Sequence, residues 1–449
     1  MEFLNKYISG AVVPLSIVVL SLIFWIKLKG KPFTNMNFVF SAIFKDKNND
    51  GGIKAVIFAL AGTLGVGNIV GVASAISLGG AGAVFWMWIS ALLAMILKYC
   101  EVVLSILHRR NRHGENYGGA MYYMKDWFAQ IKKSHIGIVF IFVFITFCLI
   151  NGFTMGGIIQ SNAITESLKT TLGIDNKISG VILSLLCIIV FLFNGKRIFT
   201  LCEKLVPFVS CLYLVISLAI ILLSYNSIPS IFINIIKSAF SFESFGGGVC
   251  GFFLSKALRY GTIRGLFSNE AGCGTSPIAH ATSNTDNPVK QGILGIVEVF
   301  IDTILVCSMT AFVILLNNDA SEIIDVNPIL IVYSSYSAVL GNIANIFLCI
   351  SICLFAFATI ICWGYYGKEC IYYFSKRKHA ETLYYCFYVF TIYLGSYIDL
   401  DFVWELADLA IGIMTVMNLF ILYKMRNEIA QTTELYIKKS SQKRAQKIK

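Results

Sequence analysis

A glycine-rich stretch interrupts an apolar segment and could expose the chemistry of its own backbone. Residues 61–71 read Ala-Gly-Thr-Leu-Gly-Val-Gly-Asn-Ile-Val-Gly, inside a segment (residues 53–78) that is long enough to cross a bilayer. Its four glycines weaken a helix, since each costs about 1 kcal/mol relative to alanine. A helix broken at membrane depth offers free N–H and C=O groups to an anion and a cation. Close helix packing through small residues is the alternative interpretation.

The break would provide two kinds of binding group. The N–H groups of Val66 and Gly67 would meet a carboxylate, because the N-terminus of a half-helix favours an anion. The carbonyl oxygens of Ala61 and Leu64 would coordinate a hard cation such as Na⁺. Asn68 could offer its amide oxygen to a cation or its NH2 group to a carboxylate. Capping of the freed backbone is the alternative role for this asparagine.

A second segment, residues 256–274, has glycines and polar residues where an ordinary membrane span would have leucine and isoleucine. Interrupted segments at matching places in two halves of a chain indicate an inverted-repeat transporter. We expect a small pocket beside this second break, with Phe267 as its size limit or, alternatively, as a core residue. The lining residues would be Gly265, Leu266, Phe267, Ser268 and Asn269.

Two carboxylates lie one helical turn apart in the apolar segment 291–316. Intramembrane carboxylates are functional candidates by default, because a charge inside a membrane is costly. Glu298 and Asp302 could relay protons or could meet Arg259 or Arg264. A structural ion pair is the interpretation that we prefer.

Other polar residues stand beside apolar runs. Gln160 and Asn162 follow the predicted span 136–159, where they could hold the amino or carboxylate group of a substrate or begin an external loop. Lys98 and Glu101 are three residues apart, a spacing that predicts a local ion pair. His280 falls in a loop, without the partner spacing of a metal site.

The composition is that of a multi-pass membrane protein. The 449 residues are 57% hydrophobic and 14% charged, whereas a soluble domain has about 25% charged residues. The net charge of +11 does not imply nucleic acid, because most basic residues lie between apolar runs and in the C-terminal tail. Thirteen cysteines without a CxxC pair predict buried free thiols rather than a zinc site.

Hydropathy predicts an all-α fold with about eleven membrane spans. The spans are residues 11–28, 53–78, 82–107, 136–159, 178–194, 202–224, 247–270, 291–316, 343–367, 381–398 and 402–423. Residues 32–50 are interpreted as an interfacial helix and a loop. Without the first span, ten spans divide into two halves of five, and an odd number per half inverts the second half. The parts are residues 1–52 with one extra helix, 53–224, 247–424, and a basic tail, 425–449.

Loop charges predict the orientation in the plasma (inner) membrane. Lys and Arg are concentrated in one set of alternate loops and in the tail, while the other set carries more Asp and Glu. By the positive-inside rule, the N-terminus would be outside and the C-terminus in the cytoplasm. The tail from residue 431 is predicted to be disordered and to touch anionic lipid.

Several motifs together resemble the alanine or glycine:cation symporter family. The strongest is Arg-Gly-Leu-Phe-Ser-Asn-Glu-Ala-Gly at residues 264–272, and Gly-Asn-Ile at 67–69 matches the first broken helix of the family. Further matches are residues 71–73, 79–88, 98–101, 118–123, 277–281, 300–303, 355–360 and 363–367. The resemblance covers about residues 50–425. The family usually has proline at Ala81 and Ala120, threonine at Val66 and serine at Ala358.

The resemblance implies a sodium-coupled symporter for alanine or glycine with a five-plus-five inverted repeat. It implies that Thr359 is a cation ligand beside Asn68, with a hydrogen bond to the backbone carbonyl four residues earlier as the alternative. It also implies that Trp363 is a wall of the substrate site, with core packing as the alternative for the tryptophan. Ala358 lacks the hydroxyl that the family supplies there, so proton coupling through Asp302 or Glu298 is the first rival. A channel is the second rival, and an intramembrane enzyme lacks motif support. No cofactor is expected; the partners would be a small neutral amino acid, Na⁺ and membrane lipids.

Overall fold

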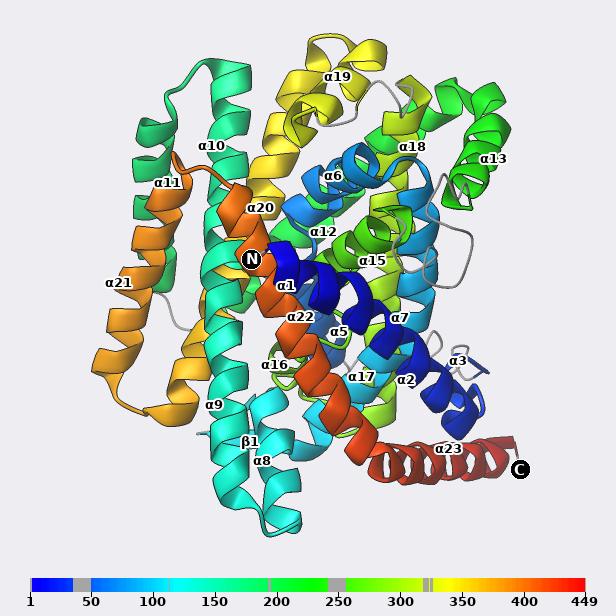
Figure 1. The fold of residues 1–449 in the computed structure, drawn as a ribbon. Coiled ribbons are helices and arrows are strands. Elements are labelled where there is room, and N and C mark those ends of the chain that lie inside the picture. The colour runs from blue at the N-terminus through cyan, green and yellow to red at the C-terminus, as the bar shows by residue number, and fades with distance from the viewer. Residues whose placement is uncertain are drawn as a thin grey trace.

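Long helices packed side by side form almost the whole protein (Figure 1). The computed structural model describes residues 2–34, 50–112, 114–192, 195–240, 256–317, 323 and 326–448. Within these ranges the strands are β1 (Arg110–Arg112) and β2 (Glu115–Tyr117), which pair antiparallel in a short hairpin. The all-α prediction is therefore confirmed apart from this hairpin.

Seven helices of the described ranges are long and apolar enough to cross a membrane. They are Phe3–Leu28, Gly82–His108, Ser134–Leu172, Arg197–Leu223, Pro288–Asn317, Ile343–Phe374 and Asp401–Lys424. Shorter apolar helices span Gly52–Thr63, Val70–Gly79, Asn176–Phe191 and Pro328–Leu340. The multi-pass architecture follows from these helices, while the number of eleven spans and the inverted repeat stay predictions.

The two glycine-rich segments are both interrupted helices. The first consists of α5 (Asp50–Thr63), a short 3₁₀ turn (Val66–Asn68) and α6 (Val70–Gly79). The second consists of α15 (Lys256–Asn269) and α16 (Ser276–His280), joined by six non-helical residues. Gly272 and Gly274 in this connection both have φ of 84°, which favours glycine. Residues 247–255 of the predicted seventh span lie outside the described residues.

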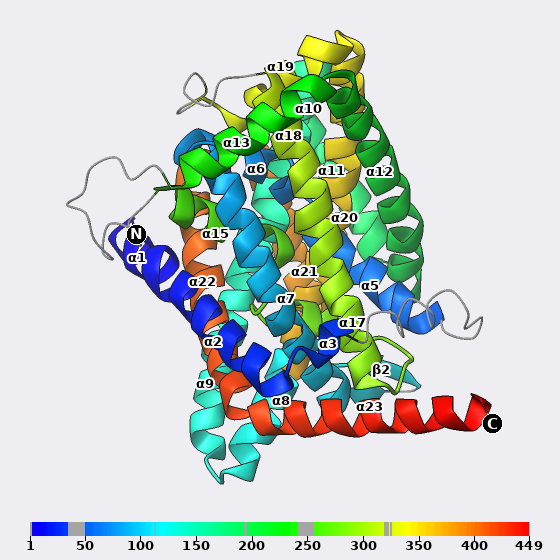
Figure 2. The same ribbon diagram turned by 90° about the vertical axis from the view of Figure 1, so that its right-hand side faces the viewer.

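Helix α7 (Gly82–His108) is the central buried helix and packs against both α15 and α17 (Pro288–Val299) (Figure 2). Glycines permit this close approach, as in other membrane helix pairs. A Cβ atom on Gly261 of α15 would meet the Ala83 carbonyl of α7, and one on Gly292 of α17 would lie 2.8 Å from Tyr99 and Val103. Larger residues at these glycines would push the helices apart.

The other elements surround this centre. They are α1 (Glu2–Tyr7), α2 (Val13–Leu28), α3 (Lys31–Thr34), α8 (Ala120–Gln130), α9 (Ser134–Asn151), α10 (Ile159–Leu172), α11 (Asn176–Phe191), α12 (Gly195–Leu223), α13 (Ile228–Ala239), α18 (Ser308–Asn317), α19 (Pro328–Leu340), α20 (Ile343–Phe374), α21 (Lys378–Gly395), α22 (Asp401–Lys424) and α23 (Arg426–Ile448). Helices α13 and α19 fall where the sequence predicted no helix. Most of the predicted interfacial segment 32–50 lies outside the described residues.

Wider π-helical turns interrupt several helices. They are η1 (Ile8–Val12), η3 (Gly152–Ile158, between α9 and α10) and η5 (Phe300–Cys307, between α17 and α18). The helix that contains η3 continues from Ser134 to Leu172, so the prediction that this span ends at residue 159 was wrong. Hydrophobicity falls after Ile159, but the chain stays helical because protein rather than lipid surrounds it. Such π-turns often occur at functional sites.

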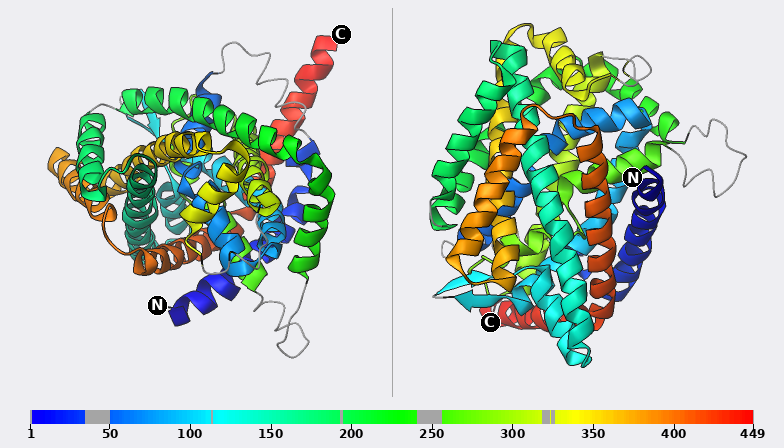
Figure 3. Two further views of the ribbon diagram at one scale, coloured as in Figure 1. Left: turned by 90° about the horizontal axis from the view of Figure 1, so that it is seen from above. Right: turned by 60° about the vertical axis from the view of Figure 1, so that its left-hand side comes forward.

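The predicted disorder of the tail is wrong for the described residues. Helix α23 runs across one end of the bundle, roughly perpendicular to the long helices (Figure 2). Its first turns are tied to the bundle through Thr433 and Tyr99, whose hydroxyl oxygens lie 2.7 Å apart, and through the ion pair of Glu434 with Lys31 at 2.9 Å. Figure 3 shows how far this helix projects beyond the bundle. Its contact with lipid stays a prediction.

The loop charges and the fold together predict the sidedness of two turns. The α8–α9 turn lies at the end of the bundle that carries α23, and the α10–α11 turn lies at the opposite end (Figures 1 and 3). A cysteine at exposed Lys177 should therefore react with a membrane-impermeant maleimide in intact cells, whereas one at exposed Ser134 should react only after permeabilisation. The parent protein measures the background from native thiols. Labelling in the reverse pattern would invert the predicted orientation.

Candidate functional site

The first break releases two backbone carbonyls. In a continuous helix, the N–H groups of Gly65 and Asn68 would donate to the carbonyls of Ala61 and Leu64, four residues earlier. Instead, the Gly65 N–H donates to Oδ1 of Asn68 at 3.0 Å, and the Asn68 N–H donates to the Gly65 carbonyl at 3.3 Å. This local turn is the capping role that the sequence allowed for Asn68. It leaves the Ala61 and Leu64 oxygens without these helical donors.

The released carbonyls face a threonine on α20. The Oγ1 atom of Thr359 lies 3.1 Å from the Ala61 oxygen, 3.3 Å from the Leu64 oxygen and 3.1 Å from the Phe355 oxygen. A hydroxyl has a single hydrogen, so it cannot satisfy three acceptors at once. The result is a buried group of oxygens in which the two released carbonyls, Ala61 and Leu64, share the single hydroxyl proton of Thr359, which also lies near the Phe355 carbonyl of its own helix. Three residues predicted as cation ligands, Ala61, Leu64 and Thr359, are therefore brought together.

The fourth predicted ligand, Asn68, points toward a different group. Its Nδ2 atom donates to Oδ1 of Asp302 at 2.7 Å and to the Ser268 hydroxyl at 2.9 Å. Ser268 and Thr303 each donate to Oδ2 of Asp302 at 2.8 Å. The buried Asp302 carboxylate, on the π-turn η5, thus joins the first break to α15. The sequence marked Asp302 and Ser268 but not their connection to Asn68.

The arginine partners predicted for the two carboxylates are wrong. Glu298 contacts Lys98 of α7 at 3.2 Å and Nε2 of His280 at 2.7 Å. An ion pair is thus present at Glu298, with a lysine and not an arginine, whereas Asp302 accepts its described hydrogen bonds from neutral groups. His280 is buried in α16 rather than exposed in a loop. Folding, not spacing in the sequence, brings these residues together.

Lys98 pairs with Glu101 as predicted, at 3.9 Å, but both side chains are fully buried. The Glu101 carboxylate accepts the N–H groups of Gly272 and Gly274 at 3.2 and 3.1 Å, and Nδ2 of Asn418 at 3.0 Å. The free N–H groups of the second break are therefore held by an internal carboxylate. This occupation leaves the first break as the better place for an external anion.

At the first break, the Val66 N–H donates to Oε1 of Gln160 at 3.0 Å, and Nε2 of Gln160 donates to the Met155 carbonyl at 3.1 Å. Gln160 is buried within a continuous helix, so the alternative of an external loop start is wrong for this residue. Asn162, two residues later on the same helix, donates to the Gly395 carbonyl at 3.1 Å. Gln160 is the group that an incoming carboxylate would have to displace from Val66.

The two predicted aromatic walls lie against different glycines. A Cβ atom on Gly67 would lie 3.2 Å from the Phe267 ring, so Phe267 covers the first break closely. The ring of Trp404 is 4.9 Å from that of Phe267, and neither Trp404 nor its neighbour Asp408 was singled out in the sequence. Trp363 packs on Gly156 at the π-turn η3, and its Nε1 atom is buried without a hydrogen-bond partner.

The remaining residues of the second segment serve its own packing. A Cβ atom on Gly265 would lie 3.0 Å from the Ser90 hydroxyl of α7, so this glycine faces α7. Asn269 accepts the Ala271 N–H at 3.0 Å and donates to Thr303 at 3.0 Å. Leu266 is buried in the core. Of the five predicted lining residues of the second segment, Phe267 contacts Gly67 of the first break, and Ser268 accepts a hydrogen bond from Asn68.

Cavities approach the first broken helix from both ends of the bundle. One, of about 830 Å³, reaches Val66 and is rimmed by Arg264, Trp404 and Glu405. Arg264 pairs with Asp408 at 3.0 Å and lies over the Trp404 ring at 4.4 Å. This arginine is therefore part of the rim.

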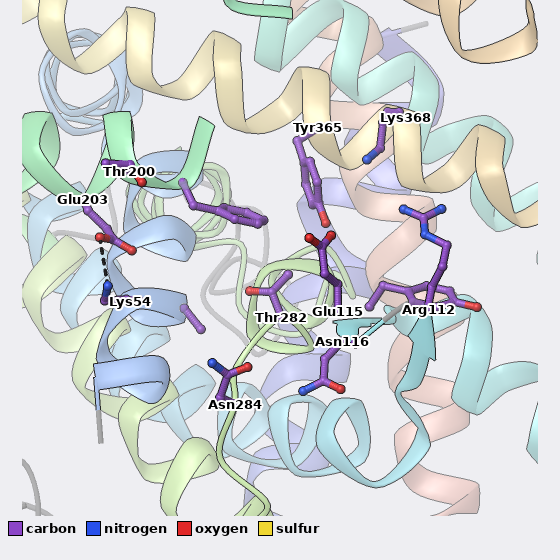
Figure 4. A pocket seen from close by; sticks show the side chains of 14 residues that line it. Lys54, Arg112, Glu115, Asn116, Thr200, Glu203, Thr282, Asn284, Tyr365 and Lys368 are labelled. Atoms are coloured by element: carbon purple, nitrogen blue, oxygen red, sulfur yellow. Dashed lines mark ion pairs between the residues drawn. The ribbon is translucent and has the colours of Figure 1, made fainter. Parts of the chain in front are cut away.

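The other cavity, of about 670 Å³, is lined by Lys54 and Ala55 of α5 and by Tyr365 of α20 (Figure 4). Lys54 pairs with Glu203 at one side of it, at 3.5 Å. Ten residues along the broken helix separate Ala55 from Val66, and the eleven helical rises between them correspond to roughly 16 Å. Between them Leu60, Ala61 and Leu64 are buried. The oxygen cluster thus lies between two vestibules that do not meet.

The whole chain matches the model of one protein family, described as the sodium:alanine symporter family, over residues 1–449. The chain belongs to this family. It is 32% identical to the sodium/alanine symporter AgcS of Methanococcus maripaludis, over 89% of this chain and 88% of that protein. It is 34% identical to a Bacillus subtilis protein named "Probable sodium/glutamine symporter GlnT", over 85% of this chain and 77% of that protein.

Solved structures show a similar fold at low sequence identity. A Na⁺-coupled sialic acid symporter, in a substrate-bound outward-open state, matches 96% of this chain and 86% of its own with a TM-score of 0.50 and 13% identity. A manganese transporter of Eremococcus coleocola matches 83% of this chain and 76% of its own with a TM-score of 0.51 and 12% identity.

Family membership confirms the resemblance seen in the sequence. The protein is an integral multi-pass membrane protein and a cation-coupled amino-acid symporter, and its family places it among transporters rather than enzymes.

Gly65 should be the least replaceable glycine of the first break. A Cβ atom there would lie 2.6 Å from Oγ1 of Thr359 and 3.0 Å from Oε1 of Gln160, whereas one on Gly71 would find its nearest neighbour at 4.0 Å. Overpacking typically costs about 1–3 kcal/mol. We expect Gly65→Ala to reduce substrate uptake about tenfold or more, and Gly71→Ala to leave it nearly unchanged. Equal uptake by both variants, at equal expression, would refute this role of Gly65.

Proposed function

We propose that the protein is a Na⁺-coupled symporter that imports a small neutral amino acid, alanine or glycine, by alternating access. The convergence of the Ala61 and Leu64 carbonyls on the Thr359 hydroxyl carries this proposal. A hard monovalent cation needs several neutral or weakly charged oxygens in one place, as unwound helices of transporters supply. This cluster has such oxygens within the bundle, and the Ala61 and Leu64 carbonyls lack their helical N–H donors.

The charge around the outer vestibule supports a cation as the coupling partner. Four acidic residues line the 830 Å³ cavity and one arginine opposes them. The acidic residues are Glu166, Asp399, Asp401 and Glu405. Because a cleft of one sign concentrates counter-ions, such a vestibule would raise the local concentration of Na⁺. By the loop charges, this vestibule opens to the outside.

For the substrate, the carboxylate would bind the N–H groups of Val66 and Gly67, after the Gln160 amide turns away from Val66. The second break is less suitable, because Glu101 already occupies its N–H groups. Phe267 would limit the size of the side chain, since its ring lies against Gly67. The unpartnered Nε1 atom of Trp363 supports the expectation that this tryptophan borders a polar ligand.

Alternating access would use the two vestibules in turn. The halves 53–224 and 247–424 would rock about the breaks, as in transporters built from inverted repeats. The hydrogen bonds of Asn68 with Ser268 and Asp302 connect the two halves at the breaks. Their rearrangement would couple ion and substrate binding to the movement.

Proton coupling remains the alternative that a specific observation favours. Asp302 is a buried carboxylate whose described partners are uncharged, and such a group could carry a proton. A larger substrate such as glutamine is a second alternative, because one relative is named for glutamine. A channel would lack saturable, gradient-dependent uptake.

The deciding experiment is uptake of radiolabelled alanine, glycine and glutamine into proteoliposomes, with a Na⁺ gradient and a proton gradient imposed separately. Saturable alanine or glycine uptake driven by Na⁺ alone is the expected result. Uptake that ignores Na⁺ and follows an inward proton gradient would refute sodium coupling, and Asp302→Asn would then be expected to abolish it.

Thr359 allows a sharper test of the ion site. Thr359→Val keeps the shape and removes the hydroxyl, so the half-saturating Na⁺ concentration should rise about fivefold or more. Thr382→Val is the matched control, because Thr382 makes the same bond to the carbonyl four residues earlier on the exposed face of α21. Ala358→Ser, which restores the family hydroxyl, should lower the half-saturating Na⁺ concentration. An unchanged Na⁺ dependence in Thr359→Val would remove Thr359 from the site.

Phe267 tests the size limit. Phe267→Ala should admit valine or leucine and weaken alanine uptake, by about tenfold, because one methylene in an apolar pocket changes discrimination by about 1–3 kcal/mol. Phe387→Ala, at an exposed phenylalanine of α21, is the control for expression and folding. If selectivity among alanine, valine and leucine is the same in both variants, Phe267 is a core residue.

A further inference from the structure

A buried chain of polar side chains connects the two broken helices on the side of the 670 Å³ cavity, away from the oxygen cluster. It begins at Lys98 of α7, which contacts Glu298 at 3.2 Å. Glu298 contacts Nε2 of His280 at 2.7 Å, and Nδ1 of His280 lies 2.9 Å from Nε2 of Gln291. All four side chains are buried. The transport mechanism described above uses none of them.

The chain ends on the backbone of the first broken helix. Nε2 of Gln291 also lies 3.2 Å from the carbonyl oxygen of Gly52, in the first turn of α5. A Cβ atom on Gly52 would lie 3.0 Å from the Gln291 amide oxygen, so the two elements are in close contact. Because His280 belongs to α16 and Gly52 to α5, Gln291 ties the ends of both broken helices to α17.

The hydrogen bonds determine the protonation state of His280. A backbone carbonyl only accepts, so the Gln291 atom that faces Gly52 must be the NH2 group. The Ser283 hydroxyl, 3.1 Å from Oε1 of Gln291, is consistent with this orientation. The same NH2 group faces Nδ1 of His280, which must therefore accept. His280 is thus neutral here, with its proton on Nε2 and donated to Glu298.

We infer that His280 is a positioning residue for the transport cycle: when neutral it latches the start of α5 through Gln291, and when protonated it releases it. A proton on Nδ1 would face the NH2 group of Gln291, so the bond would be lost. Turning the amide would place its oxygen against the Gly52 carbonyl. In the released state Glu298 still pairs with the charged imidazole, so the proton is not left uncompensated.

Other charged groups around His280 do not have this effect. The elements packed around α16 contribute Lys98 and Glu101 from α7, Glu298 and Lys290 from α17, Lys54 from α5, Glu270 from the second break, and Tyr366 and Glu369 from α20. Lys98 lies between Glu298 and Glu101, and Lys54 turns to Glu203 in the cavity. Glu298 contacts His280 directly, and its pairing with Lys98 at 3.2 Å favours the carboxylate form that accepts the Nε2 proton. Histidine is also the side chain that ordinarily changes charge between pH 5 and 8.

The position of the latch gives it a consequence for transport. Lys54 and Ala55, one turn after Gly52, and Thr282, two residues after His280, line the 670 Å³ cavity. Release of α5 would therefore widen this vestibule. A proton binds His280 more tightly in the released state than in the latched state. Lower pH at the end of the bundle with the 670 Å³ cavity therefore favours opening of α5. The consequence for uptake rests on the proposed function, whereas the latch itself does not.

The test follows amide hydrogen exchange in the full-length protein in lipid nanodiscs between pH 5.5 and 8, corrected for the chemical exchange rate. His280→Gln keeps a donor for Glu298 and an acceptor for Gln291 but cannot titrate. Gln291→Leu removes the latch, and His135→Gln replaces an exposed histidine at the start of α9. The readout is opening of the first turns of α5, with a peptide from α22 as reference.

In the native chain and in His135→Gln, opening of α5 should rise as pH falls, by at most tenfold per pH unit for one proton. His280→Gln should stay closed at every pH, and Gln291→Leu should stay open at every pH. The same pH slope in His280→Gln as in the native chain would overturn the inference, and so would a closed α5 in Gln291→Leu at pH 8. Because this readout needs no substrate or ion, it fails or succeeds independently of the proposed symport.

Discussion

The architecture of this site depends on one turn, in which Gly65 and Asn68 bond to each other rather than to the helix before them. A helix with an interior asparagine could have kept its own ladder. The small Gly65 permits Thr359 and Gln160 to approach, and their approach makes the turn the better arrangement. The turn then releases the carbonyls of Ala61 and Leu64 inside the membrane, where unpartnered backbone is tolerated only beside protein or a cavity.

The two breaks are treated differently by the rest of the fold. Around the second break, the Glu101 carboxylate fills the backbone donors and Lys98 balances its charge. Around the first break, the partners of the backbone groups are neutral, namely Gln160 and Thr359, and the Asp302 carboxylate is bound through the Asn68 side chain. Neutral partners can be exchanged for a ligand at lower cost than an internal ion, because removing one partner of a buried charge pair is strongly unfavourable. The first break is thus the one whose hydrogen-bond partners a ligand could replace, whereas the N–H groups of the second break are bound by Glu101.

The ionic cluster near the second break and the polar groups around the first break therefore have different roles. The group of Lys98, Glu101 and Glu298 holds α7, α17 and the second break together. The histidine at its edge adds a titratable link to α5. A rigid connection of this kind couples movement of one broken helix to movement of the other, since packed polar networks switch between discrete arrangements.

The sequence by itself determined the membrane class, the two interrupted helices and the family, because hydropathy, glycine content and motif spacing are local properties. It also marked Ala61, Leu64 and Thr359, which the fold brings together. Only the tertiary structure decided the partners of Glu298 and His280, since residues 98, 280 and 298 lie on three helices that the chain order does not align. It also decided that the helix continues past residue 159, because contacts with protein replace the hydrophobicity from which a span is predicted, and that Thr433 and Glu434 tie the tail helix to the bundle.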